Sequence, residues 1–300
     1  PSAPAGRRRG RRRTDTLVGV LAAGLGFATA VCWGLADFLG GLLTRRLALA
    51  VVMLVSQLAG LTALAVVVAV GGLEVPAAAD VAPAIVAGVC QLAGIAALYG
   101  ALAMGTMSVI SPISASGAAI LPVILGIATG ERPAGLQVAG MAAALTGAVM
   151  ATRSVGEPEP NKRSRRALAL AVIAALGFGG FYVGMDAAVD SADPFWALLA
   201  ARATAGLVLA VVLLCLRPRL DAGRADLPAL VLVGLLDVGA NTCFTLGVET
   251  GLLSVVSVLA SLYPVTTVLL ARALLGERLG AIQAAGVTIA LTGVALIAAG

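Results

Sequence analysis

The polar side chains that could do chemistry in this chain lie inside long apolar runs. Histidine, the commonest general base and proton relay, is absent. Asp237 follows an apolar run, and Asn241 lies one turn further along, on the same face of a helix. A carboxylate at membrane depth is costly unless it is paired or hydrated. We therefore interpret Asp237 as the partner of a substrate amine or a coupling proton, or as half of a structural pair with a base such as Arg202.

Three further polar residues interrupt apolar runs at related positions. Asp37 and Asp186 lie 149 positions apart, and Gln91 precedes Asp237 by 146 positions. Similar offsets place residues at equivalent sites of two related segments. Asp37 and Asp186 are either substrate-binding carboxylates or groups near the ends of their spans that face headgroup water.

Aromatic residues make up only 4% of the chain, so those inside apolar runs are informative. When Asp37 is aligned with Asp186, Tyr182 falls opposite Trp33. Flat side chains at this depth either wall a cavity or pack between helices. The predicted substrate-binding residues are Trp33, Asp37, Gln91, Tyr99, Tyr182, Asp186, Asp237, Asn241 and Tyr263.

The sequence has no pattern typical of a membrane enzyme or a metal site. DDxxD, HExxH and GxGD are all missing, and the four cysteines have no CxxC spacing. We predict no catalytic residue, no metal and no cofactor.

Composition indicates that lipid is the solvent of this chain. It is 60% hydrophobic and 12% charged, with a mean hydropathy of +1.04. Six of its basic residues lie in the opening cluster at 7–13, which has no interleaved aromatic residue. We interpret this cluster as an orientation signal beside a membrane span, and expect no nucleic acid partner.

A repeat organises the whole chain. Gly130-Glu131-Arg132 recurs as Gly276-Glu277-Arg278, and Gln137 recurs as Gln283 at the same offset of 146. A period near half the chain length means that one unit was duplicated. Duplicated halves are a common design of secondary transporters, which place the substrate between the repeats.

Windows of about 19 residues predict ten membrane spans, five in each half. They lie near 17–43, 48–71, 81–103, 106–128, 134–152, 168–188, 194–216, 227–248, 252–275 and 280–299. Because five is odd, the second half must be inverted relative to the first. The expected fold is an all-α membrane protein of ten transmembrane helices in two inverted five-helix repeats. Its parts are a basic tail (1–16), the first repeat (17–152), a linker (153–167) and the second repeat (168–300).

The basic residues disagree about orientation. The opening cluster and Arg132 favour cytoplasmic termini, whereas Arg45, Arg46, the linker and Arg217 fall on the opposite side in a ten-span chain. Because the opening cluster directly precedes the first span, we expect the termini in the cytoplasm.

Local patterns predict three details. Prolines and serines in the fourth and ninth spans predict kinks. A stripe of small residues in the fifth and tenth spans, including Gly147 and Gly293, predicts close helix packing within a scaffold or at a dimer surface. Glu131 and Glu277 are expected to cap the helices that directly follow them, with a role in gating as the alternative.

These motifs resemble the EamA-like branch of the drug/metabolite transporter superfamily. The residues responsible are Leu275–Leu279 with Gln283 and Gly286, their copy at 130–147, and Tyr263-Pro264-Val265. The resemblance implies a ten-helix inverted-repeat permease with cytoplasmic termini that commonly exports amino acids, other small metabolites or drugs. The chain departs from the repeat pattern at Ala118, the counterpart of Pro264.

The sequence therefore predicts a secondary-active transporter that exports such molecules by alternating access. We expect a multi-pass protein of the cell membrane, a monomer or homodimer, whose partners are the bilayer, a small-molecule substrate and a coupling proton. The alternatives are a non-transporting membrane sensor or assembly partner and, less favoured, a membrane-embedded enzyme.

Overall fold

In a computed structural model of the chain, nearly every residue of the predicted spans is helical. The structure describes residues 5–44, 46–104, 107–151, 162–218, 223–275 and 280–300, and within these ranges it contains no strand. The helices are α1 (Ala5–Thr44), α2 (Leu49–Gly71), α3 (Ala82–Met104), α4 (Met107–Thr129), α5 (Gly135–Ala151), α6 (Lys162–Val189), α7 (Pro194–Leu216), the 3₁₀ helix η1 (Arg224–Asp226), α8 (Leu227–Thr250), α9 (Leu253–Ala260), α10 (Tyr263–Leu275) and α11 (Ala281–Ala299).

The expected span boundaries agree with these helices to within a few residues, except at two starts. α1 begins at Ala5, so the region interpreted as a tail is largely helical, and α6 begins at Lys162, inside the expected linker. Six described helices are long and apolar enough to cross a membrane, and four shorter apolar segments accompany them.

The ninth predicted span is two helices rather than one. Proline lacks the N–H that would bond to the carbonyl four residues earlier. For Pro264 that residue is Ala260, where α9 ends. The Ser261 hydroxyl donates to the carbonyl of Val258 at 2.8 Å, so a neighbouring side chain satisfies part of the break. The expected kink is therefore a full interruption here, whereas α4 is unbroken.

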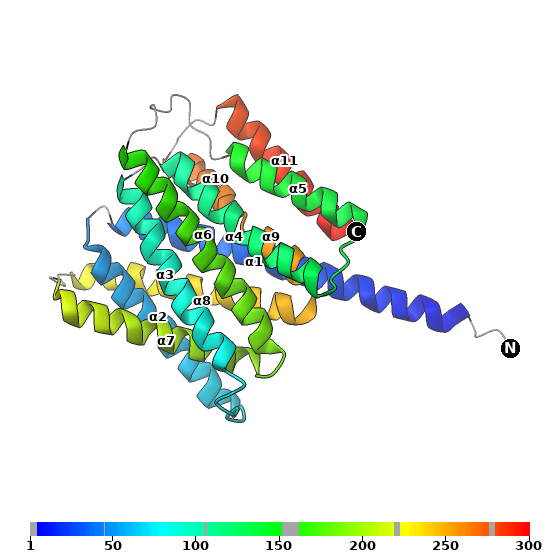
Figure 1. Cartoon of the computed structure of the whole chain (residues 1–300), viewed down its shortest axis with the longest axis horizontal. Helices are drawn as coiled ribbons and strands as arrows, with labels where there is room; N and C mark the ends of the chain where they lie inside the picture. Colours follow the sequence, from blue (N-terminus) through cyan, green and yellow to red (C-terminus); the bar gives the residue numbers. More distant parts are fainter. Residues whose placement is uncertain (1–4, 45, 105–106, 152–161, 219–222, 276–279) are drawn as a thin grey trace.

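Helices of the first half pack mainly on helices of the second half (Figure 1). α3 packs on α6, and α1 packs on α8. In the same way α4 packs on α6, while α9 and α10 pack on α1. Two pairs form opposite flanks of the bundle, α5 with α11 and α2 with α7. The core thus lies between the halves rather than inside each one.

Glycines let the flanking helices approach closely. A Cβ added to Gly147 of α5 would lie 2.3 Å from the Ala290 nitrogen of α11, and one added to Gly293 would lie 2.5 Å from the Ala144 nitrogen. The small-residue stripes of the fifth and tenth spans therefore face each other inside the chain. Because this contact buries them, the scaffold interpretation of the stripes is confirmed, and they are not a free dimer surface.

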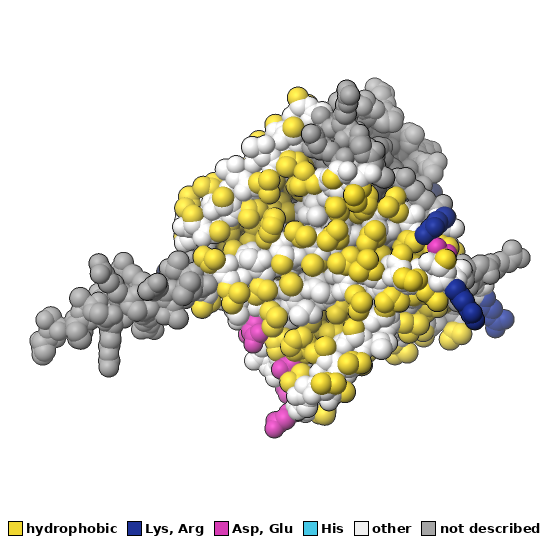
Figure 2. Space-filling view, turned by 180° about the vertical axis from the view of Figure 1, so that it is seen from behind, with side chains coloured by type: hydrophobic (Ala, Val, Ile, Leu, Met, Phe, Trp, Pro, Cys, Tyr) yellow, Lys and Arg dark blue, Asp and Glu magenta, His cyan; other side chains and the backbone are white. Residues whose placement is uncertain are grey.

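Charged residues gather at the two ends of the bundle, with an apolar belt between them (Figure 2). Successive spans, with α9 and α10 counted as one, cross the bundle in alternate directions, so every second connection lies at the same end. The turn at Glu131 contacts Leu253 at one end, and Arg46 pairs with Asp226 at the other. The acidic end, on the side of the chain termini, carries Glu74, Asp80, Asp190, Asp193 and Glu249, together with Arg132. The basic end carries Arg46, Arg165, Arg166, Arg217 and Arg224, together with Asp226.

Candidate functional site

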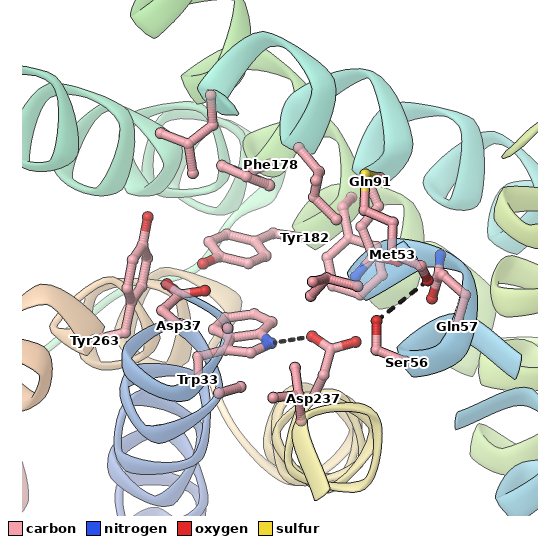
Figure 3. Close-up of a pocket in the computed structure, with 17 residues that line it drawn as sticks. Trp33, Asp37, Met53, Ser56, Gln57, Gln91, Phe178, Tyr182, Asp237 and Tyr263 are labelled. Carbon is pink, nitrogen blue, oxygen red and sulfur yellow. Dashed lines mark hydrogen bonds between the residues drawn. The ribbon is translucent and has the colours of Figure 1, made fainter. Parts of the chain in front are cut away.

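A cavity of about 940 Å³, part of it open to solvent, lies between the two halves (Figure 3). It is lined by α1, α2 and α3 of the first half and by α6, α8 and α10 of the second. The lining residues of α1 lie in its second half and those of α2 and α8 in their first halves. Gln91 lies near the middle of α3, and the lining residues of α6 lie in its second half. Because neighbouring spans alternate in direction, the cavity extends from the middle of the bundle toward the basic end.

A chain of polar side chains crosses one wall of the cavity. Arg202 of α7 donates to Gln57 Oε1 of α2 and to Asp237 Oδ2 of α8. Asp237 Oδ1 also accepts from Trp33 Nε1 at 3.2 Å, and Asn241 Nδ2 approaches Asp237 Oδ2 at 3.5 Å. Gln91 of α3 donates to Asn241 Oδ1 at 3.4 Å. Five helices from both halves therefore meet in one network.

The ion pair at the centre of this network is mostly buried. The side chain of Arg202 is 5% exposed and that of Asp237 25% exposed, because only Asp237 lines the cavity. A buried ion is stable only when hydrogen bonds satisfy it, and both partners here have several. The structural pairing considered for Asp237 and Arg202 is therefore present, at the edge of the cavity itself.

Aromatic rings form the inner wall and the floor. Trp33 of α1 and Tyr182 of α6 stack with centroids 5.8 Å apart and planes 17° apart. Tyr263 meets Trp33 edge-on at 6.3 Å, and Phe244 stacks on Tyr182 at 4.6 Å. Offset-stacked and edge-on rings attract one another beyond the area that they bury. Trp33, Tyr182 and Tyr263 line the cavity, and Phe244 packs against Tyr182 outside the lining.

Asp37 lies in the cavity beside these rings (Figure 3). It is one turn beyond Trp33 on α1 and therefore shares its face. Among the described residues it has no hydrogen-bond or ion-pair partner, and its side chain is exposed to the cavity. It is thus unlike Asp237, whose charge is neutralised.

A contact joins the two halves at the acidic end. α4 ends in a turn in which Gly130 has φ of 110°, Gly130 N donates to Ile127 O, and Glu131 N donates to Gly126 O at 2.8 Å. A left-handed residue in this position is the usual end of such a helix, and glycine adopts it without strain. The turn directs the Glu131 carboxylate to the start of α9, where it accepts from Leu253 N and Ser254 N.

This contact corrects the expected role of Glu131. The carboxylate caps a helix of the other half rather than the helix that follows it. At the start of α5 the amide of Gln137 accepts from Ala134 N, and Gln283 plays the equivalent part for α11. Glu277 lies outside the described residues.

The predicted site residues divide into those that line the cavity and those that do not. Trp33, Asp37, Gln91, Tyr182, Asp237 and Tyr263 line it, and Asn241 reaches it through the polar network. Asp186 does not line it; this residue faces the acidic end, near Asp190 and Glu131. The side chain of Tyr99 lies outside the described part of the structure.

Several lining residues escaped the sequence reasoning. Gln57 is a single amide in an apolar run, and that isolation was the one signal available for it. Met53, Phe178 and Phe181 have the side chains expected of any apolar helix, so only the packing shows that they line the cavity.

Comparison with known proteins agrees with this architecture. Residues 165–299 match the model of the EamA-like transporter family. A solved structure, described only as a crystal structure of a protein, has 18% sequence identity and a TM-score of 0.74 over 92% of this chain and 94% of the other; at this identity the likeness shows a shared fold. No curated protein matches the chain.

The match covers most of the second half, including α6 to α11. Together with the apolar helices, it makes the chain an integral membrane protein with several spans. Over residues 165–299 the chain is therefore similar to the EamA-like transporter family, part of the drug/metabolite transporter superfamily.

Proposed function

We propose that this protein is a secondary-active transporter of the cell membrane that moves small organic molecules by alternating access, with the central cavity as its substrate site. The observation that carries the proposal is the cavity between the halves, where an apolar wall surrounds a few convergent polar groups. The match of residues 165–299 to a transporter family favours transport over catalysis.

The two halves are proposed to be inverted five-helix repeats, residues 17–152 and 168–300. Equivalent helix pairs support this, because α3 packs on α6 as α8 packs on α1, and α2 packs on α8 as α7 packs on α3. Glycine contacts support it further. Gly88 of α3 meets the Ala201 carbonyl of α7, and Gly234 of α8 meets the Ser56 carbonyl of α2.

Alternating access requires that the acidic end can open when the basic end closes. Three buried hydroxyls near the closed end support such a motion. Thr245, Ser254 and Ser257 have no hydrogen-bond partner among the described residues. A buried hydroxyl without a partner is costly, and opening the acidic end would hydrate it. We propose that these groups face water in the opposite state.

The direction of transport is proposed to be export, with amino acids, related metabolites or drugs as substrates and a proton as the coupling ion. Asp237 is one candidate for proton coupling. Replacing Asp237 with Asn should abolish the dependence of transport on a pH gradient in reconstituted vesicles. Retained dependence on the gradient would exclude Asp237 from that role.

The test of transport compares metabolites in the cytosol and medium of cells that express the wild-type chain or a variant with a filled cavity. Ser56→Phe fills it without removing a charge, since the Ser56 hydroxyl donates only to the Met53 carbonyl of its own helix. Leu207→Phe, on the exposed face of α7, adds a ring outside the cavity and serves as the control.

We expect at least one compound to leave cells that express the wild-type chain or Leu207→Phe, and to stay in cells that express Ser56→Phe. Chromatography of the fluorescently tagged proteins checks that all three fold. If no compound differs across a broad panel of metabolites and vesicle uptake is also absent, a non-transporting sensor or assembly partner explains the cavity better.

A further inference from the structure

The cavity holds one acidic side chain that has no basic partner in the described part of the chain. Its charged lining residues in the described part of the chain are Asp37 and Asp237. Asp237 is neutralised by Arg202, and the guanidinium of Arg202 is too buried to meet a ligand. Asp37 has no partner among the described residues, so the cavity presents one carboxyl group that no base in the described part of the chain compensates.

A carboxylate at this depth favours a positively charged partner. Its cost within a membrane is several kcal/mol smaller when a cation or water compensates it. The pocket offers water, but its lining is mainly apolar, so a bound organic cation is the better complement.

The rings beside Asp37 favour the same kind of ligand. Trp33 lies one turn away on α1, Tyr182 is close enough to interact electrostatically with the Asp37 carboxylate, and Tyr263 meets Trp33 edge-on. Figure 3 shows Asp37 among these three side chains. The faces of aromatic rings attract ammonium and guanidinium groups, and the attraction grows when water is excluded.

A free carboxylate on the ligand would have no counterpart. The cationic side chain nearest to the cavity, Arg202, already donates to Gln57 and Asp237. The remaining polar lining residues, Ser56, Gln57 and Gln91, can meet hydroxyls or amides but carry no charge. An anion or a zwitterion would therefore face the unbalanced charge of Asp37 with nothing to attract its own carboxylate.

We propose that the cavity binds a small organic monocation without a free carboxylate, its ammonium held by Asp37 and its apolar body lying against Trp33, Tyr182 and Tyr263. The inference rests on the proposed function in taking the cavity as the substrate site, and it narrows the substrate class to amines and related cations.

The test measures binding directly, without transport. The chain has two tryptophans, so Trp196→Phe leaves Trp33 as a fluorescent reporter inside the cavity. The Trp196→Phe protein, purified in lipid nanodiscs, is titrated with four probes that share a phenyl ring: phenethylamine, 2-phenylethanol, phenylalanine and 3-phenylpropionate. We expect phenethylamine to bind at least about tenfold more tightly than the other three, since each tenfold corresponds to about 1.4 kcal/mol.

Variants of the two equivalent aspartates identify the responsible charge. Asp37→Asn should weaken phenethylamine binding about tenfold and leave 2-phenylethanol unchanged, a difference expected for the loss of a charged partner. Asp37→Glu should keep the preference for the amine. Asp186→Asn, which removes the equivalent carboxylate outside the cavity, should bind like the parent protein.

Equal affinity for the amine, the alcohol and the zwitterion would overturn the inference, as would unchanged amine binding in Asp37→Asn or no amine binding at millimolar concentration. The outcomes separate the two proposals. Amine binding without any transport contradicts the proposed function alone, whereas transport of a neutral or anionic compound that Ser56→Phe blocks contradicts only the cation inference.

Discussion

The carboxylate of Glu131, just after α4, accepts hydrogen bonds from the backbone amides of Leu253 at 2.6 Å and Ser254 at 3.1 Å, at the start of α9. These amides are donors that a helix cannot satisfy within itself, and the positive end of the helix dipole adds to the attraction. One side chain of the first half thereby holds a helix of the second half at the acidic end of the bundle.

We predict that Glu131→Gln loosens this end. The amide has only one acceptor oxygen and no charge, so at least one of the two contacts is lost, at a cost of about 1–3 kcal/mol. Hydrogen exchange followed by mass spectrometry should show faster exchange in the segment Leu253–Ser257 and unchanged exchange in α2. Glu249→Gln, an exposed residue of the same end, is the control. If the segment Leu253–Ser257 exchanges its amide hydrogens equally fast in the two variants, Glu131 does not hold α9.

The polar network predicts strong coupling between Arg202 and Asp237. Removing one partner of a buried ion pair leaves the other charge uncompensated, which costs about 3–5 kcal/mol. Arg202→Gln and Asp237→Asn should each lower the unfolding temperature in nanodiscs substantially. The double variant should lower it by less than the sum of the two single decreases.

A surface ion pair in the same chain provides the matched control. Arg46 and Asp226 are 3.0 Å apart at the basic end, where the Arg46 side chain is 62% exposed. Exposed pairs contribute at most about 1 kcal/mol. Arg46→Gln and Asp226→Asn should therefore change the unfolding temperature little. Additive effects at Arg202 and Asp237 would contradict the coupling.

Removing the buried hydroxyls should raise the unfolding temperature, whereas breaking the buried ion pair should lower it. Ser254→Ala with Ser257→Ala removes two buried groups that have no partner in the described structure, each costing about 1–3 kcal/mol. The closed acidic end becomes more stable, so the unfolding temperature should rise and transport should slow. Ser261→Ala, which removes a hydroxyl bonded to the Val258 carbonyl, should instead destabilise the protein. Faster transport in the double variant would contradict the proposed hydration of these groups.

The sequence alone predicted the element pattern well because span length, repeat period and turn residues are local properties. It also singled out Trp33, Asp37, Gln91, Tyr182 and Asp237, which line the cavity, because polar and aromatic groups inside apolar runs are rare in such a chain. What it could not predict depends on which helix faces meet. Asp186 follows Tyr182 by four residues, as Asp37 follows Trp33, but Asp186 lies toward the acidic end. Glu131 caps a helix that is more than 120 residues away in sequence.

The flanking helices offer a test of close packing. In Gly147→Ala the new Cβ would lie 2.3 Å from the Ala290 nitrogen of α11, closer than any real contact, so the helices must separate. Such overpacking typically costs about 1–3 kcal/mol. Gly206→Ala, in the middle of α7 with nothing within 4 Å of its Cβ, should stabilise the helix by up to about 1 kcal/mol. Unfolding temperatures measured in nanodiscs should therefore move in opposite directions, and a shift in the same direction would contradict the packing.

The orientation of the chain in the membrane should depend on the arginine cluster at residues 7–13. With cytoplasmic termini, the exposed arginines of the basic end face outward, against the usual rule, and only the arginines of residues 7–13 and Arg132 oppose them. We predict that replacing the six arginines of the cluster with glutamine inverts a large part of the molecules. A C-terminal fluorescent reporter that matures only in the cytoplasm should be bright in the parent chain and dim in this variant at equal expression, because removing these charges leaves the basic end as the more strongly retained side. A reporter that stays equally bright would show that other features of the helices set the orientation.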